Sequence, residues 1–280
     1  MPLVQSVTYN DTETWDAAPV DCENPTTVKT GSTRKYGVEV ETSNCPNYRE
    51  LYGQTVFGAK YDCSVSGMEF VSPILVGDEG FEKIDAFFEL ADARSFDVNG
   101  DCGLHVHLDV SEENTVQLRH IAYAYSMTYA AWRGLVSEWR ANDCHYCHAP
   151  SYGANEIRLC GKIKRWLRTT DRYSYLNFTS YDKFGSYECR LMDGSVNPTE
   201  IKNWIMAHIR FIDAVRNMTY DQIDAMFNGN ARAQFSALRS IWDNADGDNI
   251  SNYYNRRFHV HGPGLRNDDD DDDDDNGDWD

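Results

Sequence analysis

Several segments of the chain alternate apolar and polar residues with the period of a β-strand. In residues 35–42, KYGVEVET, the side chains of Tyr36, Val38 and Val40 take every second position. Residues 102–110, CGLHVHLDV, follow the same strict alternation. Each segment is expected to bury its apolar face. Shorter strands are predicted at residues 67–75, 173–179 and 186–192.

Other segments repeat apolar residues with the period of an α-helix. The longest apolar stripe runs from Leu118 to Trp139, and we expect Ser111 to cap the start of its helix. A second helix is expected to open at Asn197-Pro198. Further helices are predicted at residues 80–95, 220–228 and 231–244, and an irregular loop at residues 142–160. This mixture of strands and helices, without an internal repeat, indicates an α+β fold.

The pattern divides the chain into three parts. Residues 1–30 are polar and have no clear period, so we expect an N-terminal arm. Residues 31–266 contain nearly all the periodic segments and are expected to form one domain that carries the site. Residues 267–280 are mostly Asp and have nothing to bury, which predicts an acidic disordered tail.

The net charge of the chain limits the partners that we expect the protein to bind. The chain has 45 acidic against 26 basic side chains, and ten of the acids are Asp residues of the tail, so the body carries a formal charge of −9. A surface that neutralises phosphates needs a basic face, so nucleic acid is not expected as a partner. No apolar stretch approaches the ~20 residues that span a bilayer, and the first residues lack a secretory pattern. We therefore expect a cytoplasmic protein without a membrane partner, whose eight cysteines are mostly free thiols.

Three of the predicted strands carry a closely spaced polar pair opposite their apolar residues. In a strand, residues i and i+2 point to the same side, so each pair enters one shared space. If the strands belong to one sheet, their polar faces combine into one cavity. The pairs are Glu39 with Glu41, His105 with His107, and Glu188 with Arg190.

The charges of these side chains indicate what the cavity binds. With Glu69 of a fourth strand, the cavity would hold four carboxylates, which cannot all remain ionised unless cations lie among them. Arg190 supplies one cation, and a divalent metal most simply supplies the rest. Oxygen-rich ligand sets suit Mg²⁺ or Mn²⁺, and magnesium commonly takes its remaining ligands from phosphates. Taken singly, each pair has an ordinary explanation as a solvated face or a cross-strand ion pair.

In their order along the chain, these segments resemble the amidoligase family, which is distantly related to glutamine synthetase and glutamate–cysteine ligase. The resemblance covers about residues 34–217. The segments CGLHVH and ECRLMDGSVNP are similar to the Gly-x-x-His-x-His and Glu-x-Arg segments of glutamine synthetase. The segments that carry the resemblance are RKYGVEVE, YDCS, GMEFVSPIL, CGLHVH, YSYLNF and YECRLMDGSVNP.

The resemblance implies an ATP-dependent ligase that joins a carboxylate to an amine through an acyl phosphate. It implies a glutamine-synthetase-like curved antiparallel sheet, with amphipathic helices on its convex face and with ATP and divalent ions on its concave face. The two substrates are open: each is a small molecule, a peptide or a protein. Three alternatives also remain open: a guanidino-kinase-like phosphotransferase, a metal-dependent hydrolase that uses the His-x-His strand, and a non-catalytic scaffold on a ligase fold.

The resemblance also implies roles for single residues. Glu41 and Glu69 would bind the ion nearest the carboxylate substrate. Arg190 would meet the transferred phosphoryl group, and Asp62, in YDCS, would orient the amine or would only make a turn. The ion that bridges the ATP phosphates would be held by Glu39, His105 and Glu188, with His107 on the nucleotide or substrate side.

The loop at residues 142–160 contains Cys144 and Cys147 in C-x-x-C spacing. Tetrahedral Zn²⁺ accepts such ligands, so a structural zinc held with Cys160 and His148 is one hypothesis. Free thiols in a substrate-side loop are the other, and we favour it.

The acidic tail contains no catalytic geometry. Deletion of residues 268–280 is therefore expected to leave the steady-state rate unchanged, because the site lies within residues 31–266. Comparing the turnover of the truncated and full chains measures this. A large loss of rate in the truncated chain would show that the tail takes part in catalysis.

Overall fold

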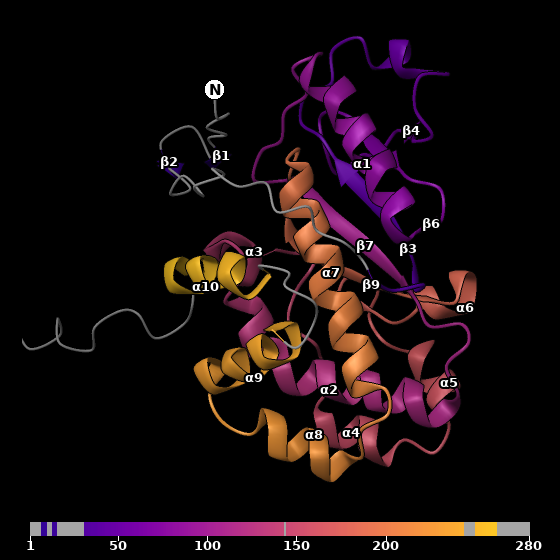
Figure 1. Cartoon of the computed structure of the whole chain (residues 1–280), viewed down its shortest axis with the longest axis vertical. Coiled ribbons are helices and arrows are strands. Elements are labelled where there is room, and N and C mark those ends of the chain that lie inside the picture. The colour runs from indigo at the N-terminus through magenta and orange to yellow at the C-terminus, as the bar shows by residue number, and fades with distance from the viewer. Residues whose placement is uncertain (1–6, 10–12, 16–30, 143, 244–249, 262–280) are drawn as a thin grey trace, which may run out of the picture.

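The computed structural model describes residues 7–9, 13–15, 31–142, 144–243 and 250–261 (Figure 1). Of the predicted N-terminal arm, only two short strands are described, β1 (Val7–Tyr9) and β2 (Glu13–Trp15), which pair antiparallel. The predicted acidic tail lies outside the described residues.

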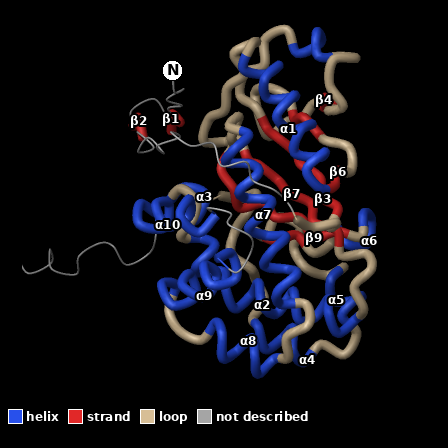
Figure 2. The backbone as a smooth tube through the Cα atoms, viewed as in Figure 1, coloured by secondary structure: helices blue, strands red, loops and turns tan. Residues whose placement is uncertain are grey.

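The centre of the molecule is an antiparallel sheet of seven strands, shown in red in Figure 2. Six strands follow the order β4-β5-β3-β7-β9-β8, and β6 pairs with β3 beside β5. The molecule combines this antiparallel sheet with helices, so the predicted α+β class is confirmed. The strands are β3 (Lys35–Glu41), β4 (Gly58–Lys60), β5 (Glu69–Val71), β6 (Leu75–Val76), β7 (Gly103–Asp109), β8 (Leu176–Asn177) and β9 (Ser186–Asp193).

The helices cover the apolar face of this sheet and continue below it (Figure 1). None of the helices in the described ranges is long and apolar enough to cross a bilayer. The helices are α1 (Gly77–Asp92), α2 (Thr115–Arg133), α3 (Glu138–Asn142), α4 (Ala154–Leu159), α5 (Ile163–Leu167), α6 (Ser180–Phe184), α7 (Pro198–Val215), α8 (Tyr220–Phe227), α9 (Ala231–Asp243) and α10 (Ile250–His261).

Strand β7 lies between β3 and β9, and the apolar residues of all three face the same side. Val38, Val106 and Leu104 are fully buried there, as the alternation predicted. Both α1 and α7 lie across this side (Figure 1). The burial of one face therefore fixes the strand register, because a slip of one residue would exchange the two faces.

The register places the polar residues of the three strands beside one another. His105 lies opposite Glu39 of β3, and His107 lies opposite Glu188 of β9. Between Leu104 and Val106 the register with β9 shifts by one residue, so Arg190 and Leu191 together face His105. Such a bulge bends a strand and redirects its side chains.

Several predicted boundaries are wrong. Helix α2 is capped by Asn114, not Ser111, because the Asn114 side chain accepts hydrogen bonds from two free amides of the first turn. The helix ends before Gly134, so Trp139 belongs to the separate α3. The loop predicted at residues 142–160 contains α4, and the strand predicted at residues 173–179 pairs only over β8.

Arg34, just before β3, fastens the sheet to the helical layer. Its guanidinium donates to Asp213 of α7 at 2.6 Å and to Glu113 at 2.9 Å, and only 7% of its side chain is exposed. Both carboxylates thus hold the guanidinium in place, and Arg34 has a structural role.

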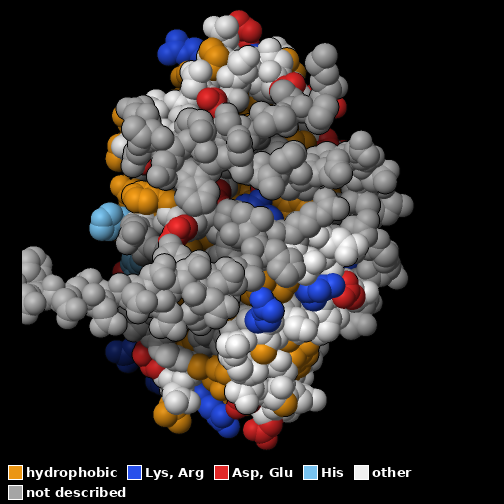
Figure 3. Space-filling view, turned by 90° about the vertical axis from the view of Figure 1, so that its left-hand side faces the viewer, with side chains coloured by type: hydrophobic (Ala, Val, Ile, Leu, Met, Phe, Trp, Pro, Cys, Tyr) orange, Lys and Arg blue, Asp and Glu red, His pale blue; other side chains and the backbone are white. Residues whose placement is uncertain are grey.

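The face of the molecule in Figure 3 shows basic side chains scattered among acidic and uncharged ones.

His208 of α7 is a core histidine, buried between helices. Its Nδ1 is 2.8 Å from the Tyr125 hydroxyl, and its ring stacks on Trp132 with centroids 4.1 Å apart. Burial lowers the pKa of His208 to about 3. The neutral imidazole is therefore the folded form at neutral pH.

This burial predicts a pH dependence of stability. Between the ordinary pKa of histidine and about 3, the unfolded chain binds a proton at His208 that the folded chain does not. The free energy of unfolding should thus fall with decreasing pH by about 1.4 kcal/mol per pH unit from this residue. Denaturant titrations at pH 7, 6 and 5 should show this contribution lost in His208→Gln and retained in His145→Gln, whose side chain is exposed. Equal slopes in the wild type and His208→Gln would contradict it.

Candidate functional site

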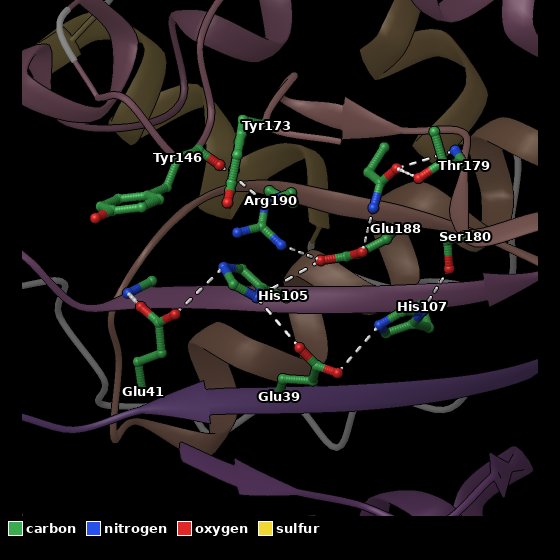
Figure 4. A network of polar contacts seen from close by, with 12 residues as sticks. Glu39, Glu41, His105, His107, Tyr146, Tyr173, Thr179, Ser180, Glu188 and Arg190 are labelled. Atoms are coloured by element: carbon green, nitrogen blue, oxygen red, sulfur yellow. Dashed lines mark hydrogen bonds and ion pairs between the residues drawn. The ribbon is translucent and has the colours of Figure 1, made fainter. Parts of the chain in front are cut away.

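The polar face of β3, β7 and β9 gathers the charged pairs into one cluster (Figure 4). Glu39 lies at its centre. One of its oxygens is 3.4 Å from Nδ1 of His105, and the other is 3.4 Å from Nε2 of His107. His107 also contacts the Ser186 hydroxyl through Nδ1 at 3.1 Å. The cross-strand register thus brings both histidines onto a single carboxylate.

Glu188 and Arg190 of β9 form the second part of the cluster. Arg190 donates from Nη1 to Glu188 at 2.5 Å and from Nε to the carbonyl of Tyr146 at 2.8 Å. The other oxygen of Glu188 accepts from the Asn177 amide at 2.7 Å. Both charged side chains are buried, with relative exposures of 6% and 8%. Because Nε and Nη1 are both hydrogen-bonded, the planar guanidinium points its Nη2 group in a fixed direction.

Glu41 and Glu69 form the third part, where β3 pairs with β5. They lie directly opposite each other in the register, and both are buried. Glu41 accepts from the amide of Gly103 at 2.6 Å and approaches Nε2 of His105 to 3.8 Å. The ammonium of Lys60 lies 2.8 Å from Glu69. Lys60 therefore supplies a cation that the sequence did not reveal.

Three of these carboxyl groups have clearly shifted pKa values. Burial would raise the pKa of Glu39, but hydrogen bonds to His105 and His107 outweigh it and hold the pKa well below the usual range. Burial raises the pKa of Glu69 to about 8, helped by the charge of Glu39 and opposed by Lys60. For Glu188, His105 and Arg190 outweigh burial and lower the pKa. The cluster thus retains a proton near neutral pH, as expected where carboxylates outnumber cations.

Glu39, His107 and Glu188 could hold a metal ion. One ligand atom from each lies within 4.8 Å of the others. Two carboxylates and one imidazole form an oxygen-rich set that suits Mg²⁺ or Mn²⁺. The sequence favoured His105 as the imidazole ligand, whereas this group contains His107. His105 instead lies between three carboxylates, 3.7 Å from Glu188.

Asp62 lies beside this cluster, on the side of Glu69 and Lys60. Its Oδ1 accepts from the amide of Ser64 at 2.8 Å and from the Ser64 hydroxyl at 2.6 Å. These bonds lower its pKa, and Glu69 and Lys60 lower it further. The turn that the sequence offered as an alternative is therefore present, and the role with an amine stays a prediction.

Sequence reasoning missed two further contributors. The Tyr146 carbonyl comes from a loop whose fold no periodicity indicated. Arg140 of α3 is buried behind β9 and donates to the backbone carbonyl of Arg190 at 2.6 Å. Lys60 could have been found from the sequence if residues 58–60 had been predicted as a strand beside β5, because that pairing places Lys60 opposite Glu69.

The described residues do not bring the four ligands of the zinc hypothesis together. The one group of three possible ligands that they contain is Glu39, His107 and Glu188. Cys160 lines a separate surface pocket of about 300 Å³, and His148 pairs with Asp171 at 3.2 Å. Cys144 and Cys147 are free thiols. Free thiols therefore stay the favoured interpretation for these residues.

Residues 23–212 match the family model described as "Putative amidoligase enzyme". The chain belongs to this family. The match spans every strand of the central sheet and all the residues of the cluster. A comparison with curated proteins found no match. The expected family is therefore confirmed.

The geometry predicts a divalent ion among Glu39, His107 and Glu188. Glu39→Gln should weaken Mn²⁺ binding by at least about 10- to 100-fold, because the loss of a residue that only orients a ligand already costs that much. Titration followed by electron paramagnetic resonance of free Mn²⁺ measures the affinity. Glu50→Gln, at a side chain that is 63% exposed, is the matched control and should bind as the wild type does. Equal affinities in both variants would place the ion elsewhere.

Proposed function

We propose that the protein is an ATP- and Mg²⁺-dependent ligase that forms an amide between a carboxylate and an amine through an acyl phosphate. One observation carries the proposal: on one sheet face, a possible divalent-metal site of two carboxylates and a histidine lies against a buried arginine. Membership of the amidoligase family supports a ligase. The identities of the carboxylate and the amine stay open.

The chemistry explains why a ligase needs these residue types. A carboxylate is a poor electrophile. Its oxygen therefore first attacks the γ-phosphorus of ATP, the bond to the β-phosphate oxygen breaks, and ADP leaves. The amine nitrogen then attacks the acyl carbon, loses a proton, and phosphate leaves. Phosphoryl transfer asks the protein mainly to position the reactants and to place cations around charged oxygens.

Metal binding is assigned to the carboxylates of the cluster. Glu39 and Glu188, with His107, would hold an ion on the phosphate side, and Glu41 and Glu69 would hold one near the carboxylate substrate. Bound Mg²⁺ would neutralise phosphate charge and align the reacting oxygens. The proton retained by Glu69 supports this assignment, because a bound cation would release it. His105, 3.4 Å from Glu39 and 3.7 Å from Glu188, keeps those carboxylates in place and stays a predicted ligand.

Arg190 is assigned to the transferred phosphoryl group. Its Nε and Nη1 are engaged by Tyr146 and Glu188. Within the described part of the chain, no hydrogen bond uses its Nη2, which leaves this group for an anionic oxygen. Because the side chain is buried and doubly held, it meets developing charge without further reorganisation.

Asp62 is assigned to the incoming amine. It is only partly buried and its lowered pKa keeps it ionised, so it can attract and orient an ammonium group. Lys60 donates to Glu69 and interacts with the charge of Asp62 through space, and it would be displaced by an incoming cation.

Thermal melts and ADP release together test the proposal. With ATP plus Mg²⁺, the melting temperature of the wild type should rise more than with either alone, since a ligand at 100 times its dissociation constant adds about 2.7 kcal/mol. Glu188→Gln should lose most of this shift and at least about 100-fold of the ADP release that substrates induce. Circular dichroism should show an unchanged fold in the variant.

The matched control is Glu79→Gln, which changes a side chain that is 73% exposed on α1 and should behave as the wild type. Two results would count against the ligase: no joint effect of ATP and Mg²⁺ on the wild type, or full turnover in Glu188→Gln. Hydrolysis of substrate by metal alone, without nucleotide, would favour the hydrolase.

A further inference from the structure

The cysteines of the C-x-x-C motif, Cys144 and Cys147, lie together in one tight turn. The amide of Cys147 donates to the carbonyl of Cys144 at 3.3 Å. The Cys147 thiol donates to the backbone carbonyl of Arg140 at 3.5 Å. Cys144 retains 6% exposure and Cys147 1%, with the exposed His145 and Tyr146 between them. Both sulfurs therefore contact Arg140 just below the surface.

Arg140 gives Cys144 the character of a thiolate. Its guanidinium is buried and donates to the Cys144 sulfur from Nη1 at 3.3 Å. The other hydrogen bonds of the guanidinium reach only the backbone carbonyls of Arg190 and Leu191. A buried cation needs an anion beside it, and here the contacting group that can ionise is Cys144.

More distant carboxylates do not replace this partner. Asp193 is hydrogen-bonded by Ser137 and lies 3.6 Å from Arg257. Glu41 accepts from the Gly103 amide. Both act on Arg140 only through space. Cys147 and the charge of Arg140 together outweigh burial and lower the pKa of Cys144 to about 5.

We propose that Cys144 and Cys147 are a peroxide-reactive dithiol that closes to an intramolecular disulfide. The Cys144 thiolate attacks one oxygen of hydrogen peroxide, the O–O bond breaks, and hydroxide leaves as water after taking a proton. This oxidises Cys144 to a sulfenic acid. The Cys147 sulfur then attacks the Cys144 sulfur and loses its proton, and the hydroxyl leaves as a second water.

The surroundings of this pair differ from those of the other cysteines. Burial raises the pKa of Cys102 to about 12 and that of Cys189 still further, so both stay protonated. Cys63 is exposed. Peroxide is close to water in size, which suits the slight exposure of Cys144. A cysteine that combines thiolate character with a resolving partner is the reactive kind.

The pair is also placed to influence the cluster. The Tyr146 carbonyl, which holds Nε of Arg190, lies in the turn between the two cysteines. Arg140 links the Cys144 sulfur to the backbone of Arg190. The redox chemistry does not depend on the ligase activity and is tested without it.

The test is a peroxide time course on the reduced full chain. Samples are quenched with an alkylating reagent, digested and analysed by peptide mass spectrometry. A Cys144–Cys147 disulfide should form about tenfold or more faster than Cys63 is oxidised, because an ordinary thiol is only a few per cent thiolate at pH 7. Cys63→Ser should leave this disulfide unaffected.

Variants of the pair separate the two steps. Cys147→Ser should stop at the sulfenic acid of Cys144, which a 1,3-diketone probe captures. Cys144→Ser should show neither product in the turn. Three results would overturn the proposal: Cys144 and Cys147 still reduced after Cys63 is oxidised, a disulfide that pairs either with another cysteine, or no probe capture at Cys144 in Cys147→Ser.

Discussion

The pairing of β7 between β3 and β9 is the constraint on which the rest of the molecule depends. It sets Glu39 opposite His105 and His107 opposite Glu188, so acidic and imidazole groups meet on one face. The other face, with Val38 and its neighbours, must be covered by helices because it is apolar. One register therefore determines both the core and the cluster.

The protonation states of the carboxyl groups in that cluster depend on neighbouring charges as well as on burial. Glu39 is kept ionised by two histidines, whereas Glu69 keeps its proton and contacts Lys60. An acidic site that lacks enough fixed cations gains stability from any cation that enters. This imbalance favours the binding of a cation, and Arg190, the buried cation of β9, is held by two hydrogen bonds.

The sequence predicted the strands and their polar pairs because period-two alternation is a local property. It identified all the carboxylates of the cluster and both histidines for the same reason. It favoured His105 as the metal ligand, whereas the group that could hold an ion contains His107. Both histidines lie on the same face of β7, and their distances to the carboxylates depend on the cross-strand register, which alternation does not give. The Ser111 cap failed because Asn114, three residues later, competes for the same role.

Contributions from loops lay beyond sequence reasoning. The Tyr146 carbonyl and the Arg140 side chain reach Arg190 from segments with no periodic pattern. Backbone carbonyls carry no signature in a sequence, and the position of a buried arginine depends on tertiary packing. The α10 helix was missed because its apolar residues are interrupted by polar ones.

The register shift beside His105 has a consequence for comparing relatives of this chain. Before the shift, Glu188 and Arg190 lie on the polar face of β9; after it, Met192 lies opposite Leu104 on the apolar face. The strand is thus two half-strands of opposite phase, joined at Leu191. A relative that lacks one residue here would pair without the shift, and its second half would still present the same side to the core. An alignment that places a gap at this point therefore marks the loss of the bulge and not a change in the core.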